Sequence, residues 1–143
     1  MYVKQISVFI ENTPGRLADF TKVLAERKID LVSLSIADTT HFGILRGIVA
    51  EPEAVYEMLT GLGYSVKVTE VLAVFVPDHP GGLAGILALL AEKNIALEYL
   101  YSFVRQAGDH ALIIMRVDQP VEAAKVLTEA GIRLLHQDEL KAL

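Results

Sequence analysis

The chain contains one stretch of sequence twice, and this repeat limits what it can fold into. Residues 8–34 align with residues 74–100 without a gap, and 12 of these 27 positions carry the same amino acid. Beyond them the alignment continues at an offset that is two residues larger. We therefore predict that the 143 residues form two copies of one small domain, at 1–70 and 71–143, rather than a single larger domain.

Hydrophobic periodicity gives the order of elements within each copy. Apolar residues alternate at Ile6, Val8 and Ile10, which predicts a strand, and a helical apolar spacing follows Pro14. The elements predicted for the first copy are this strand, a helix from Pro14 to Lys28, strands at 31–37 and 42–49, a helix from Pro52 to near Gly63, and a short last strand. Those predicted for the second copy are a strand through Leu72, Val74 and Val76, a helix ending at Asn94, strands at 97–105 and 110–117, a helix from Pro120 to near Gly131, and a short last strand.

The order β-α-β-β-α-β in each copy is the ferredoxin-like arrangement. It predicts an α+β fold of two tandem ferredoxin-like βαββαβ domains, each an antiparallel sheet with both helices on one face. The other sheet face is then bare, although 52% of the residues are hydrophobic and the mean hydropathy is +0.41. Only about three residues, spanning about 10 Å, separate Val68 from Leu72. We therefore expect the two copies to touch and to cover each other, with a second chain completing the burial.

Composition excludes several classes of function. Thirteen basic and 18 acidic residues give a net charge of −5 without any basic cluster, which argues against a nucleic-acid groove. The absence of cysteine excludes disulfides, thiolate nucleophiles and thiolate metal sites. The sequence shows neither a signal peptide nor an apolar run of about 18 residues, so we expect a cytoplasmic protein that does not enter a membrane.

The turn between the first strand and the first helix of each copy is the best candidate for a ligand site. A helix N-terminus offers N–H groups and partial positive charge, and glycine lets a ligand approach the backbone, so a carboxylate could bind there. A plain helix start, with Asn12, Thr13 or Asp78 as cap and Pro14 at the first helical position, is the alternative. The candidate ligand-binding residues are Asn12, Thr13, Pro14, Gly15, Arg16 and Leu17 in the first copy and Asp78, His79, Pro80, Gly81, Gly82 and Leu83 in the second.

No convergent set of catalytic residues is found. The four histidines, at positions 41, 79, 110 and 136, lack the spacing of a metal site, so we predict neither a metal nor a cofactor. The glycines after the second copy's first strand do not have the spacing of a nucleotide-binding loop. Arg46 and Arg116 occupy matching places and are interpreted as structural ion-pair partners, with edge charges as the alternative.

Specific residues resemble a known family. The run Glu-Asn-Thr-Pro-Gly-Arg-Leu at 11–17, the helix end Leu-Ala-Glu-Arg-Lys-Ile at 24–29 and the element order in both copies resemble the ACT domain. The resemblance implies a regulatory module that binds amino acids at the interface between two ACT units. It also implies that the turn carrying Gly15 or Gly81 holds the ligand backbone.

These observations lead to two functional hypotheses. The first is a non-catalytic sensor, expected to be a homodimer, that binds an amino acid between ACT units and regulates a partner. The second is a regulatory or assembly subunit of a metabolic enzyme that binds no small molecule. The opening strand and turn resemble the regulatory subunits of acetohydroxyacid synthase, although their second half differs. An enzyme on this scaffold is the least favoured reading.

Overall fold

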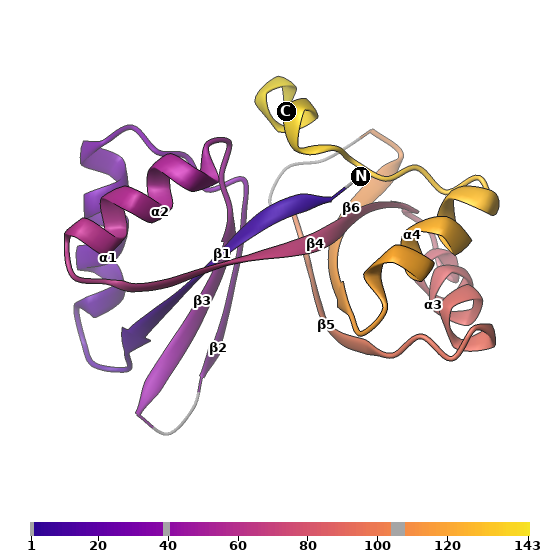
Figure 1. Cartoon of the computed structure of the whole chain (residues 1–143), viewed down its shortest axis with the longest axis horizontal. Helices are drawn as coiled ribbons and strands as arrows, with labels where there is room; N and C mark the ends of the chain where they lie inside the picture. Colours follow the sequence, from indigo (N-terminus) through magenta and orange to yellow (C-terminus); the bar gives the residue numbers. More distant parts are fainter. Residues whose placement is uncertain (1, 39–40, 104–107) are drawn as a thin grey trace. The chain divides into compact units, whose positions relative to one another are not determined.

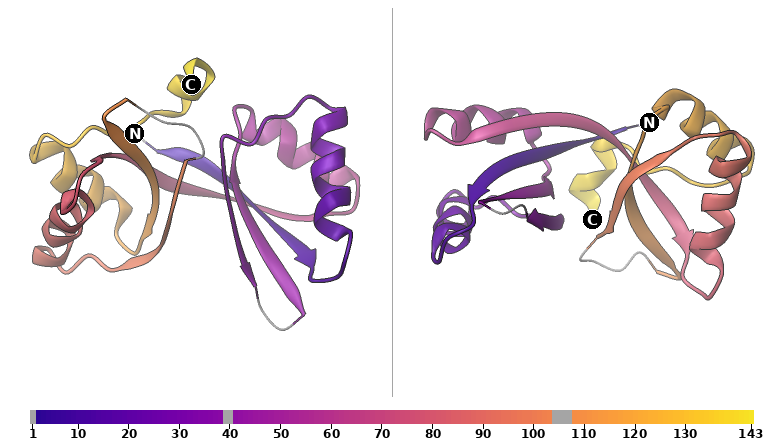
Figure 2. Two further views of the ribbon diagram at one scale, coloured as in Figure 1. Left: turned by 180° about the vertical axis from the view of Figure 1, so that it is seen from behind. Right: turned by 90° about the horizontal axis from the view of Figure 1, so that it is seen from below.

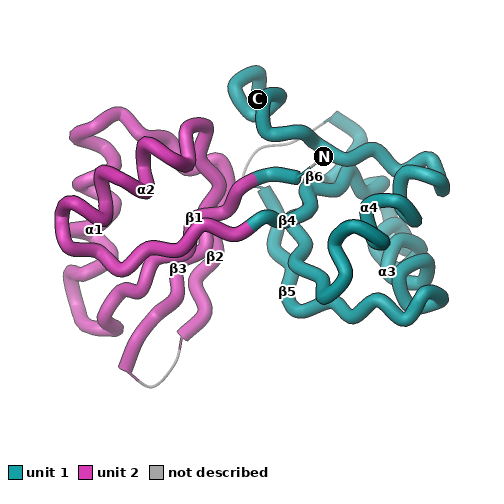
Figure 3. Tube along the Cα trace, viewed as in Figure 1, with its two compact units in different colours: residues 1–3, 70–143 teal, residues 4–69 magenta. Residues whose placement is uncertain are grey.

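The computed structural model describes residues 2–38, 41–103 and 108–143 (Figure 1). The chain forms two compact units, shown in separate colours in Figure 3. In order along the chain, the first unit comprises Lys4–Thr69, which is magenta and labelled unit 2 in Figure 3. The second comprises Glu70–Leu143 together with the N-terminal residues up to Val3, and is teal and labelled unit 1.

The first unit has the order β-α-β-β-α-β. Its elements are β1 (Val3–Glu11), α1 (Arg16–Glu26), β2 (Ser33–Asp38), β3 (Phe42–Ile48), α2 (Pro52–Gly61) and the start of β4 (Ser65–Pro77). Hydrogen-bonded neighbours follow the order β2-β3-β1-β4, and β1 and β2 are both antiparallel to β3. Helices α1 and α2 lie on the same face of the sheet (Figures 1 and 2). Their core is Ile6, Val8, Ile10, Phe20, Leu24, Leu45, Val49, Val55 and Leu59.

The second unit repeats this arrangement. After the end of β4 come α3 (Gly82–Glu92), β5 (Leu97–Ser102), β6 (His110–Val117), α4 (Pro120–Glu129) and the 3₁₀ helix η1 (Gln137–Ala142). The strand order is β4-β6-β5, and the predicted last strand is reduced to a single bridge between Val74 and Leu134. Two hydrogen bonds flank it, from Phe75 N–H to Arg133 O at 3.0 Å and from Leu135 N–H to Ala73 O at 2.8 Å. The predicted fold of two tandem ferredoxin-like domains is confirmed.

Strand β4 differs from the prediction at the join between the copies. The expected linker of about three residues does not exist as a loop, because β4 runs without a break from Ser65 to Pro77. The segment Val66–Val76 contains neither glycine nor proline and is rich in β-branched residues, so nothing in it favours a turn. One strand therefore ends the first unit and begins the second. That the two sheet faces cover each other stays a prediction.

The predicted helix ends are confirmed. Lys28 and Asn94, which follow the last residues of α1 and α3, have φ of 56° and 52°. Gly63 and Gly131 follow α2 and α4 with φ of 90° and 76°. Left-handed residues at these places end a helix and turn the chain toward the next strand. Residues 104 and 105 of the strand predicted at 97–105 lie outside the described residues.

Residues of the C-terminal segment pack against Phe75 of β4 in the second unit. The Arg133 guanidinium lies 4.3 Å from the centre of the Phe75 ring and forms an ion pair of 2.6 Å with Glu139 Oε1. The other carboxylate oxygen of Glu139 accepts the N–H of His136 at 2.7 Å. In the first unit the equivalent of Phe75 is Phe9, which is 49% exposed.

Acid is expected to loosen this segment. The N–H of His136 and then the Arg133 guanidinium hold the pKa of Glu139 below its ordinary value of 4.5. A carboxyl whose pKa is lowered in the folded state adds stability above its unfolded-state pKa, and this stability is lost as the pH falls through the folded-state pKa. We expect amide exchange of residues 137–142, referred to the intrinsic rate, to rise as the pH falls below 4.5. Glu139→Gln should remove this dependence, and an unchanged pH profile in that variant would contradict the assignment.

Candidate functional site

The two predicted turns have the same backbone hydrogen bonds. In the first, Thr13 N–H donates to Glu11 O at 2.9 Å and Asp19 N–H donates to Gly15 O at 2.9 Å. In the second, the matching bonds are His79 to Pro77 and Gly85 to Gly81, both at 3.0 Å. Each turn is also tied to the neighbouring hairpin, by Asn12 N–H to His41 O at 3.1 Å and by Asp78 N–H to Asp109 O at 3.2 Å. The sequence repeat is therefore a repeat of backbone structure.

Glycine, not a polar side chain, precedes each helix. Gly15 and Gly81 are the N-cap residues, with φ of 88° and 91°, and neither helix has a side-chain cap. The predicted caps Asn12, Thr13 and Asp78, and the placement of Pro14 at the first helical position, are therefore wrong. A left-handed glycine lets the chain turn sharply after the proline, so that α1 begins only at Arg16. The first N–H groups of such a helix have no intrahelical acceptor and suit an anionic group.

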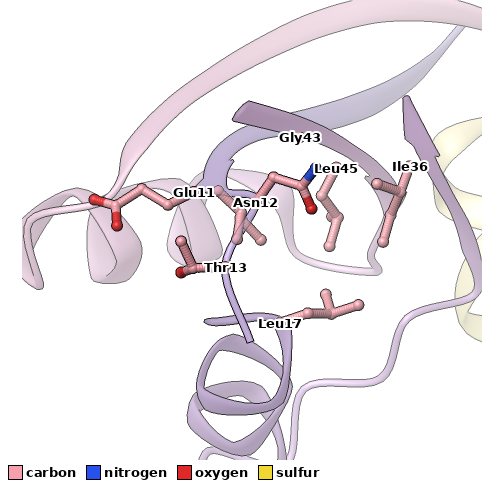
Figure 4. Close-up of a pocket in the computed structure, with 8 residues that line it drawn as sticks. Glu11, Asn12, Thr13, Leu17, Ile36, Gly43 and Leu45 are labelled. Carbon is pink, nitrogen blue, oxygen red and sulfur yellow. The ribbon is translucent and has the colours of Figure 1, made fainter. Parts of the chain in front are cut away.

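A cavity of about 170 Å³ lies beside the first turn (Figure 4). One side is formed by the turn and the start of α1, and the other by the ends of β1, β2 and β3. In Figure 4 the Asn12 amide points toward Leu45, whereas the Glu11 carboxylate points away from it. The lining residues are Ile10, Glu11, Asn12, Thr13, Leu17, Ile36, Gly43 and Leu45.

The cavity beside the second turn has a different position and lining. Its volume is about 350 Å³, and most of its wall is formed by α3 together with Ile132, the third residue beyond the end of α4. The lining residues are Pro77, His79, Gly81, Gly82, Gly85, Ile86, Leu89 and Ile132. The second cavity is thus lined by glycines and by side chains of α3, whereas the first is lined opposite its turn by side chains of β2 and β3.

Comparison with known proteins identifies the family. The family model of the ACT domain pair matches residues 1–143. The chain belongs to this family. No curated protein matches the sequence. A solved protein from Bacteroides thetaiotaomicron is 37% identical to this chain, with a TM-score of 0.92. The match covers 100% of this chain and 98% of that protein's chain.

Another solved structure shares the fold at lower identity. The regulatory subunit of aspartate kinase from Thermus thermophilus, in its ligand-free form, is 16% identical with a TM-score of 0.61. The match covers 90% of this chain and 92% of that subunit. At this identity the likeness shows the fold alone.

The first cavity of this ACT pair contains only part of the predicted site. Asn12, Thr13 and Leu17 line it, whereas Arg16 lines a neighbouring cavity and its Nε lies 3.7 Å from Glu11 Oε2. Pro14 and Gly15 shape the turn without being among the lining residues. At the second turn His79, Gly81 and Gly82 line the cavity, whereas Asp78, Pro80 and Leu83 are not among its lining residues.

Sequence reasoning missed the strand residues of the first cavity. Ile36, Gly43 and Leu45 come from β2 and β3 and face the turn from across the unit. The sequence analysis placed them only within the strands predicted at 31–37 and 42–49 and gave them no role in binding. Gly43 was a usable signal, because a glycine within a strand often marks the close approach of another group.

The second ACT unit contains a close backbone contact that the first does not share. An ideal Cβ on Gly82 would lie 2.0 Å from the carbonyl oxygen of Pro77. The first unit has Arg16 at the matching position, so its turn must leave room for a side chain. The two turns thus share their hydrogen bonds but differ in how closely the helix approaches the preceding strand.

Arg116, one of the two arginines at matching places, makes structural contacts in the second unit. Arg116 donates from Nε to Glu98 Oε2 at 3.1 Å and from Nη1 to Glu70 O at 3.0 Å, which agrees with the ion-pair interpretation. Within residues 2–38, 41–103 and 108–143, no three histidine or acidic side chains come together in a way that could hold a metal ion. In the same ranges no helix is both long and apolar enough to span a membrane.

Proposed function

We propose that this ACT pair is a non-catalytic sensor that binds an α-amino acid at its strand-to-helix turns, between ACT units, and thereby regulates a partner. The observation that carries the proposal is the first cavity, in which an uncapped helix N-terminus and the Asn12 amide lie opposite an apolar wall. An amino acid has the matching chemistry, with a charged backbone at one end and a side chain at the other.

The energetics indicate that a second surface completes the site. A carboxylate at a helix N-terminus contributes about 0.3–2 kcal/mol. Micromolar binding requires about 8 kcal/mol. Leu17 and Ile36 are 39% and 47% exposed at the cavity rim, so a facing ACT unit would bury apolar surface there and enclose the ligand. Ligand binding and homodimer assembly would then be coupled.

The relatives support a regulatory role without naming a ligand for this chain. The solved protein of the same fold from Thermus thermophilus is the regulatory subunit of aspartate kinase. A partner metabolic enzyme is therefore a natural target for the signal in our proposal.

Stabilisation by an amino acid tests the proposal. A ligand that binds only the folded state, at about 100 times its Kd, raises the free energy of unfolding by about 2.7 kcal/mol. We expect at least one of the common amino acids to raise the melting temperature saturably and to give a calorimetric isotherm. Absence of both effects for every amino acid would overturn the sensor proposal.

A partner-binding subunit without its own ligand is the second candidate. Phe9 and Phe42, which lie on adjacent strands, are 49% and 50% exposed, and such apolar surface is typical of protein contacts. A stoichiometric complex with a metabolic enzyme that no amino acid alters would favour this candidate over the sensor.

A further inference from the structure

We infer that the ligand is an α-amino acid with an uncharged aliphatic side chain, and that it binds at the first turn rather than at the second. This inference rests on the proposed function, because it presupposes that an amino acid binds the chain. It adds a side-chain class and a location.

The lining of the first cavity has two chemical ends. The polar groups Asn12 and Thr13 come from the turn, next to the N-terminus of α1. The apolar side chains Ile36 and Leu45 come from β2 and β3 on the opposite side. A ligand whose backbone lies at the turn therefore directs its side chain toward aliphatic groups, where an apolar side chain gains and a charged one loses free energy.

The charges at the cavity disfavour lysine, aspartate and glutamate. Among the described lining residues Glu11 alone carries a charge, and its carboxylate points away from Leu45 in Figure 4. Its Oε2 is instead 3.7 Å from Arg16 Nε. A charged ligand side chain would thus enter the strand side of the cavity without an opposite charge, which is unfavourable in an apolar setting.

The size of the cavity fits a short aliphatic group. Its volume of about 170 Å³ is comparable with the roughly 150 Å³ of an apolar protein cavity known to hold benzene. Gly43 contributes to this space, because a Cβ added there would lie 3.5 Å from Ile36 Cγ2. A methyl group at position 43 therefore fits the fold and takes up room at the cavity wall.

The second unit differs at each of these positions. Gly43 pairs with Ile10, and Ala111 pairs with the equivalent Val76, so Ala111 occupies the place of Gly43. By the same register Ser102 opposite Ile113 matches Ile36 opposite Leu45. The strand wall of the second unit thus carries a methyl group in place of a glycine hydrogen and a hydroxyl group in place of an aliphatic side chain.

The second turn also differs in charge. Asp78 stands at the position of Asn12 and can only accept hydrogen bonds, so it would favour a ligand ammonium, whereas the Asn12 amide can also donate to a ligand carboxylate. The close contact between Gly82 and Pro77 further changes the approach of α3 to the strand. These differences favour one ligand per chain, at the first turn.

Calorimetry with single amino acids tests the inference on the full chain. The panel is leucine, isoleucine, valine and methionine against lysine, aspartate and glutamate. Two matched variants exchange the residues of the two walls, Gly43→Ala in the first unit and Ala111→Gly in the second. Circular dichroism and thermal melting confirm that each variant is folded.

We expect at least one aliphatic amino acid to bind with one site per chain. Gly43→Ala should weaken its binding by about tenfold or more, since one methylene in an apolar pocket is worth about 10–200-fold. Ala111→Gly should leave the Kd within about twofold. Ile36→Ser, which introduces the second unit's residue, should also weaken binding.

The outcomes separate this inference from the proposed function. Saturable binding of lysine or an acidic amino acid, with none of the aliphatic ones, would support the sensor and overturn the inferred side-chain class. Two sites per chain, or a loss caused by Ala111→Gly and not by Gly43→Ala, would overturn the location. If no member of the panel binds, the other common amino acids are titrated in the same way. Binding of a polar or aromatic one would overturn the side-chain class alone, and binding of none would overturn the proposed function itself.

Discussion

Replacement of Phe20 by alanine is expected to lower the free energy of unfolding by about 3–5 kcal/mol, the usual range for a fully buried phenylalanine. The Phe20 side chain has no exposed surface and lies edge-to-face against Tyr64, with ring centres 5.4 Å apart. It packs with Leu24 of the same helix and Leu59 of α2, so its loss leaves a cavity beneath both helices. Domains of this size are stable by about 5–15 kcal/mol, so the change is a large fraction of the total.

Thr21→Ala is the matched control for this substitution. Thr21 follows Phe20 in the same helix, is exposed, and bonds only within α1, to Leu17 O and Ala18 O at 3.0 Å. Its replacement should change stability by less than about 0.5 kcal/mol. Urea unfolding followed by circular dichroism measures both variants, and hydrogen exchange shows whether the loss is confined to the first unit. A loss below about 1 kcal/mol for Phe20→Ala would contradict the packing described here.

The repeat made most of the fold predictable from sequence. Each element could be assigned twice, so a weak pattern in one copy was supported by the other, as with the helices that begin at Pro52 and Pro120. The join was predicted wrongly because the search for a domain boundary assumes a linker. The chain instead extends one strand through the boundary, which local periodicity alone does not distinguish from two short strands.

The candidate site was only partly predictable for a different physical reason. The turn is local in sequence, so its Pro-Gly motif and the nearby Asn12 stood out. The opposite wall consists of Ile36, Gly43 and Leu45, which are brought to the turn by strand pairing. Helix capping was mispredicted because polar residues before a helix usually cap it, whereas here left-handed glycines take that position.

Replacement of Gly82 by alanine should destabilise the second unit by about 3 kcal/mol, at the upper end of the usual range for overpacking. The added Cβ would lie 2.0 Å from the carbonyl oxygen of Pro77, and this backbone atom cannot rotate away as a side chain could. The same oxygen accepts the N–H of His79 at 3.0 Å, so moving it also strains the turn.

Gly85→Ala, one helical turn further along α3, should have the opposite effect. No atom lies within 4 Å of a Cβ built there, apart from the neighbouring helix backbone. Alanine should therefore stabilise the helix by about 0.8–1 kcal/mol through its higher helix propensity. Thermal and urea unfolding measure the stability of both variants. Because the two expected changes have opposite signs, a general effect of replacing glycine in α3 could not explain both. If Gly82→Ala did not lower the free energy of unfolding, the second turn would relax at little cost. The close contact could then no longer count among the reasons for assigning the ligand to the first turn.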